Sequence, residues 1–295
     1  MTEKRSSFSS LRTLLFVVIL STACALVLSI LAEFLKAPQK DARELYRSKQ
    51  LLVATRILGY QGHFLLDGKP AIYHSQAKIL IPYEGKTPPK AKNEEILALF
   101  ETRIFARLTN RNGDLYTFEE VGIDEEIYLT ENEKLGYAEL PYKLVYLVKQ
   151  NTPSKIPYGY VIPINGYGLW DAIYGYLGIK ANGDTVLGMT WYSQKETPGL
   201  GAEISLPEWQ EQFFGKDIFQ KSPGGMTNFE RAPLGIKVVK TTVEETLGKT
   251  PMAESAVDGI PGASITVSGV NEAFRRSLAP YRPFLIRANQ GEFDG

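Results

Sequence analysis

Twenty consecutive residues near the N-terminus carry no charge, and this run limits the folds and locations that the chain can have. The run covers residues 13–32, and apolar side chains continue at Phe34 and Leu35. A helix of 20 residues spans the ~30 Å hydrocarbon core of a bilayer. A cleaved signal peptide has a shorter apolar region of ~7–15 residues that ends at small side chains. The run therefore predicts one uncleaved transmembrane helix in the lipid bilayer over residues 13–35, preceded by residues 1–12.

Basic residues lie on both sides of this helix. Three precede it and five follow it: Lys4, Arg5 and Arg12, then Lys36, Lys40, Arg43, Arg47 and Lys49. An excess of Lys and Arg marks the cytoplasmic side of a membrane helix. Because neither side has a clear excess, the count does not set the orientation.

The composition excludes several classes of function. The chain has 33 basic and 33 acidic residues, so it has no net field that would attract nucleic acid. Its one cysteine, Cys24, and its two histidines, His63 and His74, are too few for a zinc site, an iron–sulfur cluster or a disulfide framework within the chain. No pair of carboxylates stands out as a general acid and base. We predict no metal site, no catalytic residues and no nucleic-acid partner.

The first part of the body has a mixed pattern. Residues 36–60 repeat apolar side chains every three or four positions, which indicates a juxtamembrane helix. Residues 61–150 form a variable α+β segment, with a helix expected near residues 93–105. A hairpin turn is expected at Asn112-Gly113, because this dipeptide suits a turn that needs positive φ.

The second part, residues 151–295, contains the more informative motifs. Two strand-like runs, residues 172–180 and 185–192, are joined at a second Asn-Gly turn, residues 182–183, and predict an antiparallel pair. The predicted fold class is α+β: a single N-terminal transmembrane helix followed by a mixed domain with an antiparallel sheet and flanking helices.

A glycine-rich loop, residues 196–203, follows the second strand. Gly199 and Gly201 allow a close backbone approach, and Thr197 offers a hydroxyl, so the loop can wrap a planar ligand. A tight structural connection explains the same residues, and the loop alone does not distinguish the two interpretations.

Two helices are predicted from their capping residues. Ser205-Leu-Pro-Glu208 has the spacing of a capping box and predicts a helix that runs to Gly215. Ser268 is the predicted N-cap of an amphipathic helix that begins near Gly269.

Two hydroxyl side chains, Ser264 and Thr266, lie just before the second of these helices. Unpaired amides and the positive end of the helix dipole favour a phosphate at such a place, and Gly262 and Ala263 add little bulk. Ordinary turn and cap chemistry is the alternative interpretation.

Three motifs, taken with the N-terminal helix, resemble a known family. Residues 166–170 read Gly-Tyr-Gly-Leu-Trp, residues 196–201 read Glu-Thr-Pro-Gly-Leu-Gly, and residues 258–266 read Asp-Gly-Ile-Pro-Gly-Ala-Ser-Ile-Thr. Their order and spacing resemble the C subunit of the Na⁺-translocating NADH:quinone oxidoreductase, the NqrC family. The likeness covers the N-terminal helix and most of residues 150–295, and it is weak over residues 61–150.

The resemblance implies a cofactor, a location and partners. In that family, a flavin transferase esterifies FMN through its phosphate to a hydroxyl of a Ser-Gly-Ala-Thr motif, and the flavin domain lies outside the bacterial inner membrane. The resemblance therefore implies covalent FMN, a cytoplasmic segment at residues 1–12, a single-pass inner-membrane helix and a periplasmic body. It also implies electron relay within the complex, with its other membrane subunits as partners. A Gly-x-Gly-x-x-Gly motif after a strand is not visible, so we do not expect NADH to bind this chain.

The same resemblance assigns the cofactor-binding residues. Where the family reads Ser-Gly-Ala-Thr, this chain reads Pro261-Gly262-Ala263-Ser264, so Ser264 is the implied phosphoester site and Thr266 the alternative. Serine lacks the β-methyl group that restricts χ1 in threonine. The loop at residues 196–201 is expected along the flavin ring, with Trp170 near it, although a core position would also suit that tryptophan. The full expected set is Ser264, Glu196, Thr197, Gly199, Leu200, Gly201, Gly262, Ala263, Thr266 and Trp170.

Other functions are compatible with the sequence. The flavin subunit of the Rnf-type electron-transport complex shares the C-terminal motif, but the length of the segment at residues 61–150 and the Glu-Thr-Pro-Gly-Leu-Gly match at residues 196–201 favour the first family. A membrane-anchored scaffold without a cofactor and an anchored hydrolase with two carboxylates belong to other classes. Flavin fluorescence of an acid-treated denaturing gel band separates the scaffold from both flavoproteins, and the hydrolase is disfavoured because no acid/base pair stands out.

Overall fold

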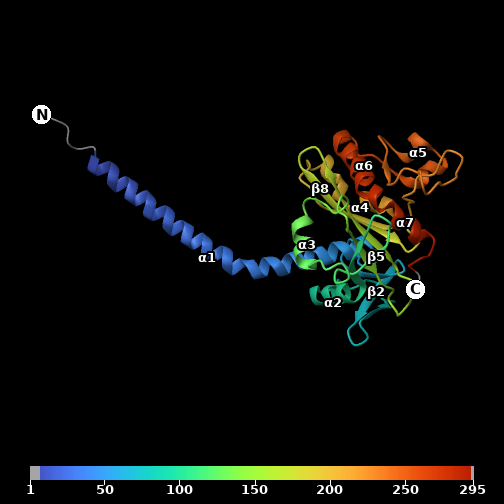
Figure 1. Cartoon of the computed structure of the whole chain (residues 1–295), viewed down its shortest axis with the longest axis horizontal. Helices are drawn as coiled ribbons and strands as arrows, with labels where there is room; N and C mark the ends of the chain where they lie inside the picture. The colour runs from blue at the N-terminus through green and yellow to red at the C-terminus, as the bar shows by residue number, and fades with distance from the viewer. Residues whose placement is uncertain (1–6, 294–295) are drawn as a thin grey trace. The chain divides into compact units, whose positions relative to one another are not determined.

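A long N-terminal helix is the first element of the computed structural model, which describes residues 7–293 (Figure 1). Helix α1 spans Ser7–Ala54 without a break and includes Pro38. Among the described residues, it is the one helix long and apolar enough to cross a bilayer. Large apolar side chains in its first half, such as Leu14, Phe16 and Leu28, are exposed. A continuous apolar surface of this kind requires a non-aqueous environment or a partner.

The C-terminal end of α1 differs from the predicted one. The apolar repeat predicts a helix over residues 36–60, but α1 ends at Ala54. Arg56 takes a left-handed φ of 55°, and the Leu58 amide donates to the Leu52 carbonyl. The helical hydrogen-bond pattern therefore stops before the last predicted turn, although apolar side chains continue.

A six-stranded antiparallel sheet forms the centre of the compact body that begins at Ser48. Its strand order is β5-β4-β6-β7-β8-β9. The strands span Ile104–Thr109 (β4), Leu115–Tyr116 (β5), Lys143–Val148 (β6), Gly159–Tyr167 (β7), Ala172–Lys180 (β8) and Val186–Ser193 (β9). The two predicted hairpins, β4–β5 and β8–β9, are present, because Gly113 and Gly183 take the positive φ values, 86° and 65°, that such turns need.

Shorter helices and two small sheets complete the body. The helices span Asn93–Arg103 (α2), Glu125–Asn132 (α3), Pro207–Gln210 (α4), Val243–Leu247 (α5), Ser264–Leu278 (α6) and Arg282–Asn289 (α7). One small sheet is antiparallel and joins Phe64–Leu66 (β1), Lys69–His74 (β2) and Ile79–Pro82 (β3). The other pairs Lys237–Val238 (β10) in parallel with Ala256–Val257 (β11). The predicted α+β class is confirmed.

Helix α6 packs against β7, and the main hydrophobic core lies around this contact. Two glycines set how closely they approach. A Cβ at Gly166 of β7 would lie 2.6 Å from the Ala273 Cβ, and a Cβ at Gly269 of α6 would lie 2.0 Å from the Tyr167 carbonyl oxygen. Since neither glycine can take a side chain without movement of the backbone, the start of α6 has a fixed position beside the end of β7.

The last turn of α1 is part of the same body. Leu51, Leu52 and Ala54 are fully buried. A Cβ at Gly178 of β8 would lie 2.1 Å from the Ala54 carbonyl oxygen, and one at Gly188 of β9 would lie 2.9 Å from it. The sheet therefore accommodates the end of this helix at two glycines on adjacent strands.

Helix α4 begins and ends differently from the prediction. It covers only Pro207–Gln210 and is followed by a short 3-10 turn, instead of one helix that runs to Gly215. Leu206 occupies the N-cap position. The Ser205 hydroxyl donates to the Ala202 carbonyl (2.7 Å), so it serves the preceding turn and does not cap α4.

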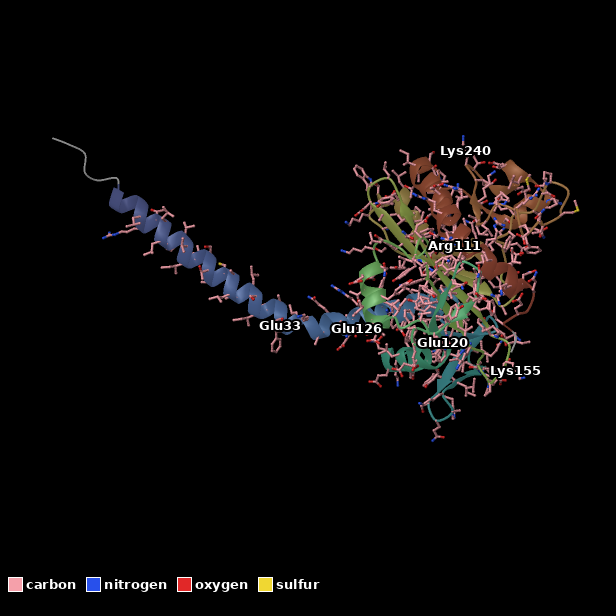
Figure 2. The ribbon with its side chains drawn as sticks, in the orientation of Figure 1. Glu33, Arg111, Glu120, Glu126, Lys155 and Lys240 are labelled. Atoms are coloured by element: carbon pink, nitrogen blue, oxygen red, sulfur yellow. The ribbon has the colours of Figure 1, made fainter. Side chains whose placement is uncertain are left out.

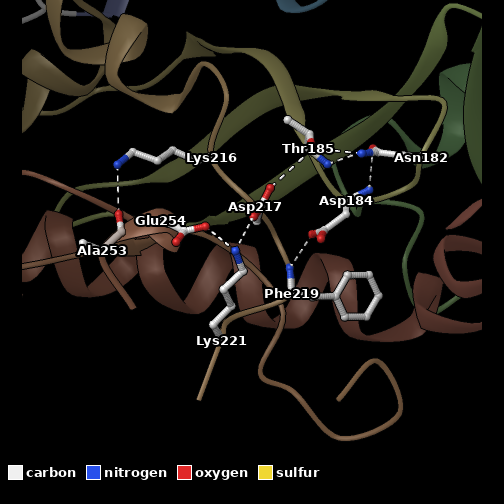
Figure 3. A network of polar contacts seen from close by, with 9 residues as sticks. All are labelled: Asn182, Asp184, Thr185, Lys216, Asp217, Phe219, Lys221, Ala253 and Glu254. Atoms are coloured by element: carbon white, nitrogen blue, oxygen red, sulfur yellow. Dashed lines mark hydrogen bonds and ion pairs between the residues drawn. The ribbon is translucent and has the colours of Figure 1, made fainter. Parts of the chain in front are cut away.

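Charged side chains, among them Lys155 and Lys240, extend from the outside of the body (Figure 2). One polar network joins the β8–β9 turn to two later segments (Figure 3). In it, Lys221 pairs with Asp217 (3.4 Å) and with Glu254. The Asp184 carboxylate accepts from the Phe219 amide (2.9 Å). Burial raises the pKa of Asp184 to about 6, because it outweighs the hydrogen bond from Phe219, which favours the charged form.

We expect Asp184→Asn to stabilise the body by about 1–2 kcal/mol at pH 8 and to have little effect at pH 4. Folding raises the pKa of this carboxyl group, so the folded state resists its ionisation. The group therefore lowers the free energy of unfolding as the pH rises from its unfolded pKa, ~3.9, through its folded pKa. Asparagine still presents an oxygen to the Phe219 amide. Thermal unfolding at the two pH values measures the effect, and a variant that is less stable at pH 8 would contradict it.

Candidate functional site

Three segments that are distant in the sequence meet at the N-terminal end of α6. They are the β7–β8 loop (residues 168–171), residues 196–201 of the glycine-rich loop after β9, and residues 262–266. Together they line a cavity of ≈ 270 Å³. The lining contains eight of the ten residues predicted from the sequence: Glu196, Thr197, Leu200, Gly201, Gly262, Ala263, Ser264 and Thr266. Leu169 and Ile265 complete the lining of the cavity and were not predicted. Each lies inside one of the three motifs that resemble the family, and that position was the signal that could have identified them.

Helix α6 begins earlier than predicted, at Ser264. The predicted N-cap, Ser268, lies inside the helix, and Ala263 takes the N-cap position without a side-chain hydrogen bond. Gly262 has a φ of 77°, a backbone conformation that glycine adopts without strain. Because the chain turns at this glycine, helical geometry starts almost directly after it and includes the two hydroxyl residues.

The structure separates the two candidate acceptor hydroxyls. Ser264 is the first helical residue and is exposed. Thr266 is only 2% exposed, and its hydroxyl donates to the Glu196 carboxylate. Of the two, only Ser264 has a side chain open to an approaching enzyme.

The surroundings of Ser264 suit an anion. The first amides of a helix lack intrahelical acceptors, and the helix dipole places positive partial charge there. Helix α6 has 15 residues, and its first turn contains no acidic side chain. A phosphate bound at Ser264 would therefore meet free amide donors at the positive end of the helix dipole.

Glu196 connects the three segments. Its carboxylate accepts hydrogen bonds from the Leu169 amide (3.0 Å) and the Trp170 amide (3.0 Å), in addition to the Thr266 hydroxyl. The side chain is 5% exposed. Burial raises the pKa of this carboxyl group, but the three hydrogen bonds together outweigh it, so the pKa lies below its usual value. Glu196 is therefore an ionised group in the cavity wall.

The side chain of Trp170 lies on the surface beside the cavity. It is 69% exposed, and its indole Nε1 donates to the Thr197 hydroxyl (3.1 Å). A core position for this tryptophan is therefore wrong. Leu200 is also partly exposed, so the indole and this leucine offer apolar surface to a planar ring.

The two glycines of the loop have different roles. A Cβ at Gly201 would lie 2.4 Å from the Thr266 hydroxyl and 2.7 Å from a Glu196 oxygen, so only glycine fits there. Gly199 has a φ of 75° with open space around its Cβ position, and it does not line the cavity. Gly199 therefore provides the backbone turn, while Gly201 provides the close approach.

A larger cavity of ≈ 560 Å³ borders the same helix. Residues of β7, β8, α6 and the segment after α3 line it, including Tyr167, Tyr174, Arg276 and Lys134. None of the ten predicted residues is among its lining. The predicted residues thus gather at the smaller cavity.

Comparisons with known proteins show several similarities to this chain. A sequence model of the FMN-binding domain matches residues 168–279. The chain is 37% identical over 289 residues to the C subunit of the Na(+)-translocating NADH-quinone reductase of Chlamydia muridarum, with 92% of this chain and 90% of that protein covered. It is 38% identical over 291 residues to the corresponding protein of Chlamydia pneumoniae, with the same coverage. The crystal structure of the C subunit of this reductase from Parabacteroides distasonis is similar, with a TM-score of 0.55, 25% identity and coverage of 85% of this chain and 96% of that one.

Proposed function

Because this chain belongs to the family of the C subunit of the Na(+)-translocating NADH-quinone reductase, we propose that it carries FMN covalently at Ser264 and relays electrons inside that oxidoreductase complex. The FMN-binding domain at residues 168–279 makes it a flavoprotein subunit. In the proposed function the protein supplies the position and electrostatics, and the flavin supplies the electron chemistry.

One observation carries this proposal: an exposed serine hydroxyl occupies the first position of α6, beside a cavity that eight of the ten predicted residues line. The residues present fit the flavin. The amides of the first turn and Ser264 suit the phosphate. Thr197, Leu200 and Trp170 suit the ring system, because they combine one hydroxyl with partly exposed apolar surface.

Attachment is a phosphoryl transfer to an alcohol. With flavin adenine dinucleotide as the activated donor, a bond would form between the Ser264 oxygen and the phosphorus of the FMN part, and the phosphoanhydride bond of the donor would break. The leaving group would be AMP, and the serine proton would be released with it. The net addition to the chain is one FMN minus one water, and a flavin transferase would catalyse the step.

The membrane arrangement is part of the same proposal. Residues 13–35 of α1 would cross the bacterial inner membrane, with residues 1–12 in the cytoplasm and the body in the periplasm. The apolar, exposed first half of α1 supports the crossing. Residues 36–60 would connect the membrane to the body, residues 61–150 would form the family's variable part and residues 151–295 the flavin region. The other membrane subunits of the complex would be its partners.

The intact mass tests the cofactor. The chain, purified from membranes of cells that express a flavin transferase, should have the mass of the polypeptide plus one FMN minus water. The same chain from cells without the transferase should have the mass of the polypeptide alone. Equal masses in the two preparations would overturn the covalent assignment.

A further inference from the structure

The charge of Glu196 has no cationic partner within residues 7–293. Its neighbour Lys195 pairs with Asp171 instead, at 2.5 Å. The donors to the Glu196 carboxylate are two backbone amides and one hydroxyl, all of them neutral. The cavity wall therefore has a net negative charge at this position.

This charge lies in the wall that the proposed flavin would contact. Glu196 lines the same cavity as Ser264, Thr197 and Leu200. Because Glu196 is 5% exposed as a residue, water screens its charge less than the charge of a surface group. Reduction adds electrons to the flavin, so a nearby fixed anion disfavours the reduced form, and protein charge near the ring is a recognised means of tuning a flavin.

We propose, on the basis of the function above, that Glu196 is the residue that lowers the reduction potential of the bound flavin. Its three hydrogen bonds hold the anion in place and tie the loop that bears Trp170 to the first turn of α6. The sequence predicts that Glu196 binds the cofactor, and this proposal gives it a more specific role: its oxygens bind the protein, and its charge acts on the flavin through space.

Two variants separate charge from structure. Glu196→Gln removes the charge and keeps the length of the side chain. Thr266→Val removes one donor to Glu196 and keeps both the charge and nearly the same volume. If the charge sets the potential, the Gln variant should shift the equilibrium with a reference dye at least tenfold towards reduced flavin, about 30 mV for a two-electron couple. The Val variant should shift it less than threefold.

The measurement is a redox titration of the flavin-loaded full-length chain, followed by absorbance, with thermal unfolding as a check on folding. If Glu196→Gln does not fold, Glu196→Asp takes its place. The Asp variant keeps the charge, so the equilibrium of its flavin with the reference dye should stay within threefold of the parent value. Equal shifts in the Gln and Val variants, or a tenfold shift in the Asp variant, would overturn the inference and leave the proposed function intact. A parent chain whose mass shows no FMN would overturn both.

Discussion

Replacing Ser264 with alanine should abolish covalent FMN and leave the body folded. The hydroxyl is the proposed ester oxygen, and it is exposed at the first position of α6. Loss of an exposed serine hydroxyl costs about 1 kcal/mol or less, so the chain should unfold at nearly the parent temperature. The readout is the mass of the peptide that contains residues 264 and 266 after co-expression with a flavin transferase.

Two control variants make this result specific. Ser264→Thr keeps a hydroxyl at the same place and should keep the FMN adduct. Thr266→Ala should also keep it, although removal of a buried donor from Glu196 costs about 1–3 kcal/mol. An adduct that survives in Ser264→Ala and disappears in Thr266→Ala would move the attachment site by two residues.

Deleting residues 1–47 should move the protein from the membrane fraction to the soluble fraction without unfolding it. The deleted segment contains the uncharged run and forms a unit separate from the compact body that begins at Ser48. Removal of the exposed apolar surface of α1 removes the reason for membrane partition. Ultracentrifugation of cell extracts and thermal unfolding of the soluble fraction measure the two parts of the prediction.

A slightly longer deletion is the matched control. Removing residues 1–58 also deletes Leu51 and Leu52, which are fully buried in the body. Burial of two leucines is worth about 3–6 kcal/mol, a large share of a typical stability of about 5–15 kcal/mol. This shorter chain should be unfolded or aggregated. If it is folded and as stable as the 48–295 chain, the end of α1 is not needed by the body.

Local signals in the sequence predicted the features that depend on local chemistry. The two Asn-Gly turns identified both hairpins, because positive φ at the glycine is a property of the dipeptide itself. Length and lack of charge identified the apolar part of α1. Helix boundaries were predicted less well, although Ser205 and Ser268 have side chains that suit an N-cap. The Ser205 hydroxyl instead bonds to the Ala202 carbonyl. The turn at Gly262 starts α6 before Ser268.

Most residues that line the smaller cavity were predictable from the sequence as a set, but their arrangement was not. Motif resemblance selected Glu196 and Thr266 together, yet their contact joins residues 70 positions apart and depends on the packing of α6 against β7. Nothing in the sequence shows that Glu196 faces the protein or that Thr266 is buried. The small β1–β3 sheet was likewise missed, because its strands are short and lie in a polar segment.

The contacts of Glu196 also bear on the order of events during maturation. Three hydrogen bonds to the Glu196 carboxylate, from Leu169, Trp170 and Thr266, join the segments of the cavity wall to one another. The chain can therefore build this wall before any flavin arrives. If a flavin transferase modifies Ser264 as proposed, we expect it to act on a folded substrate and to recognise the exposed start of a finished helix instead of an extended peptide.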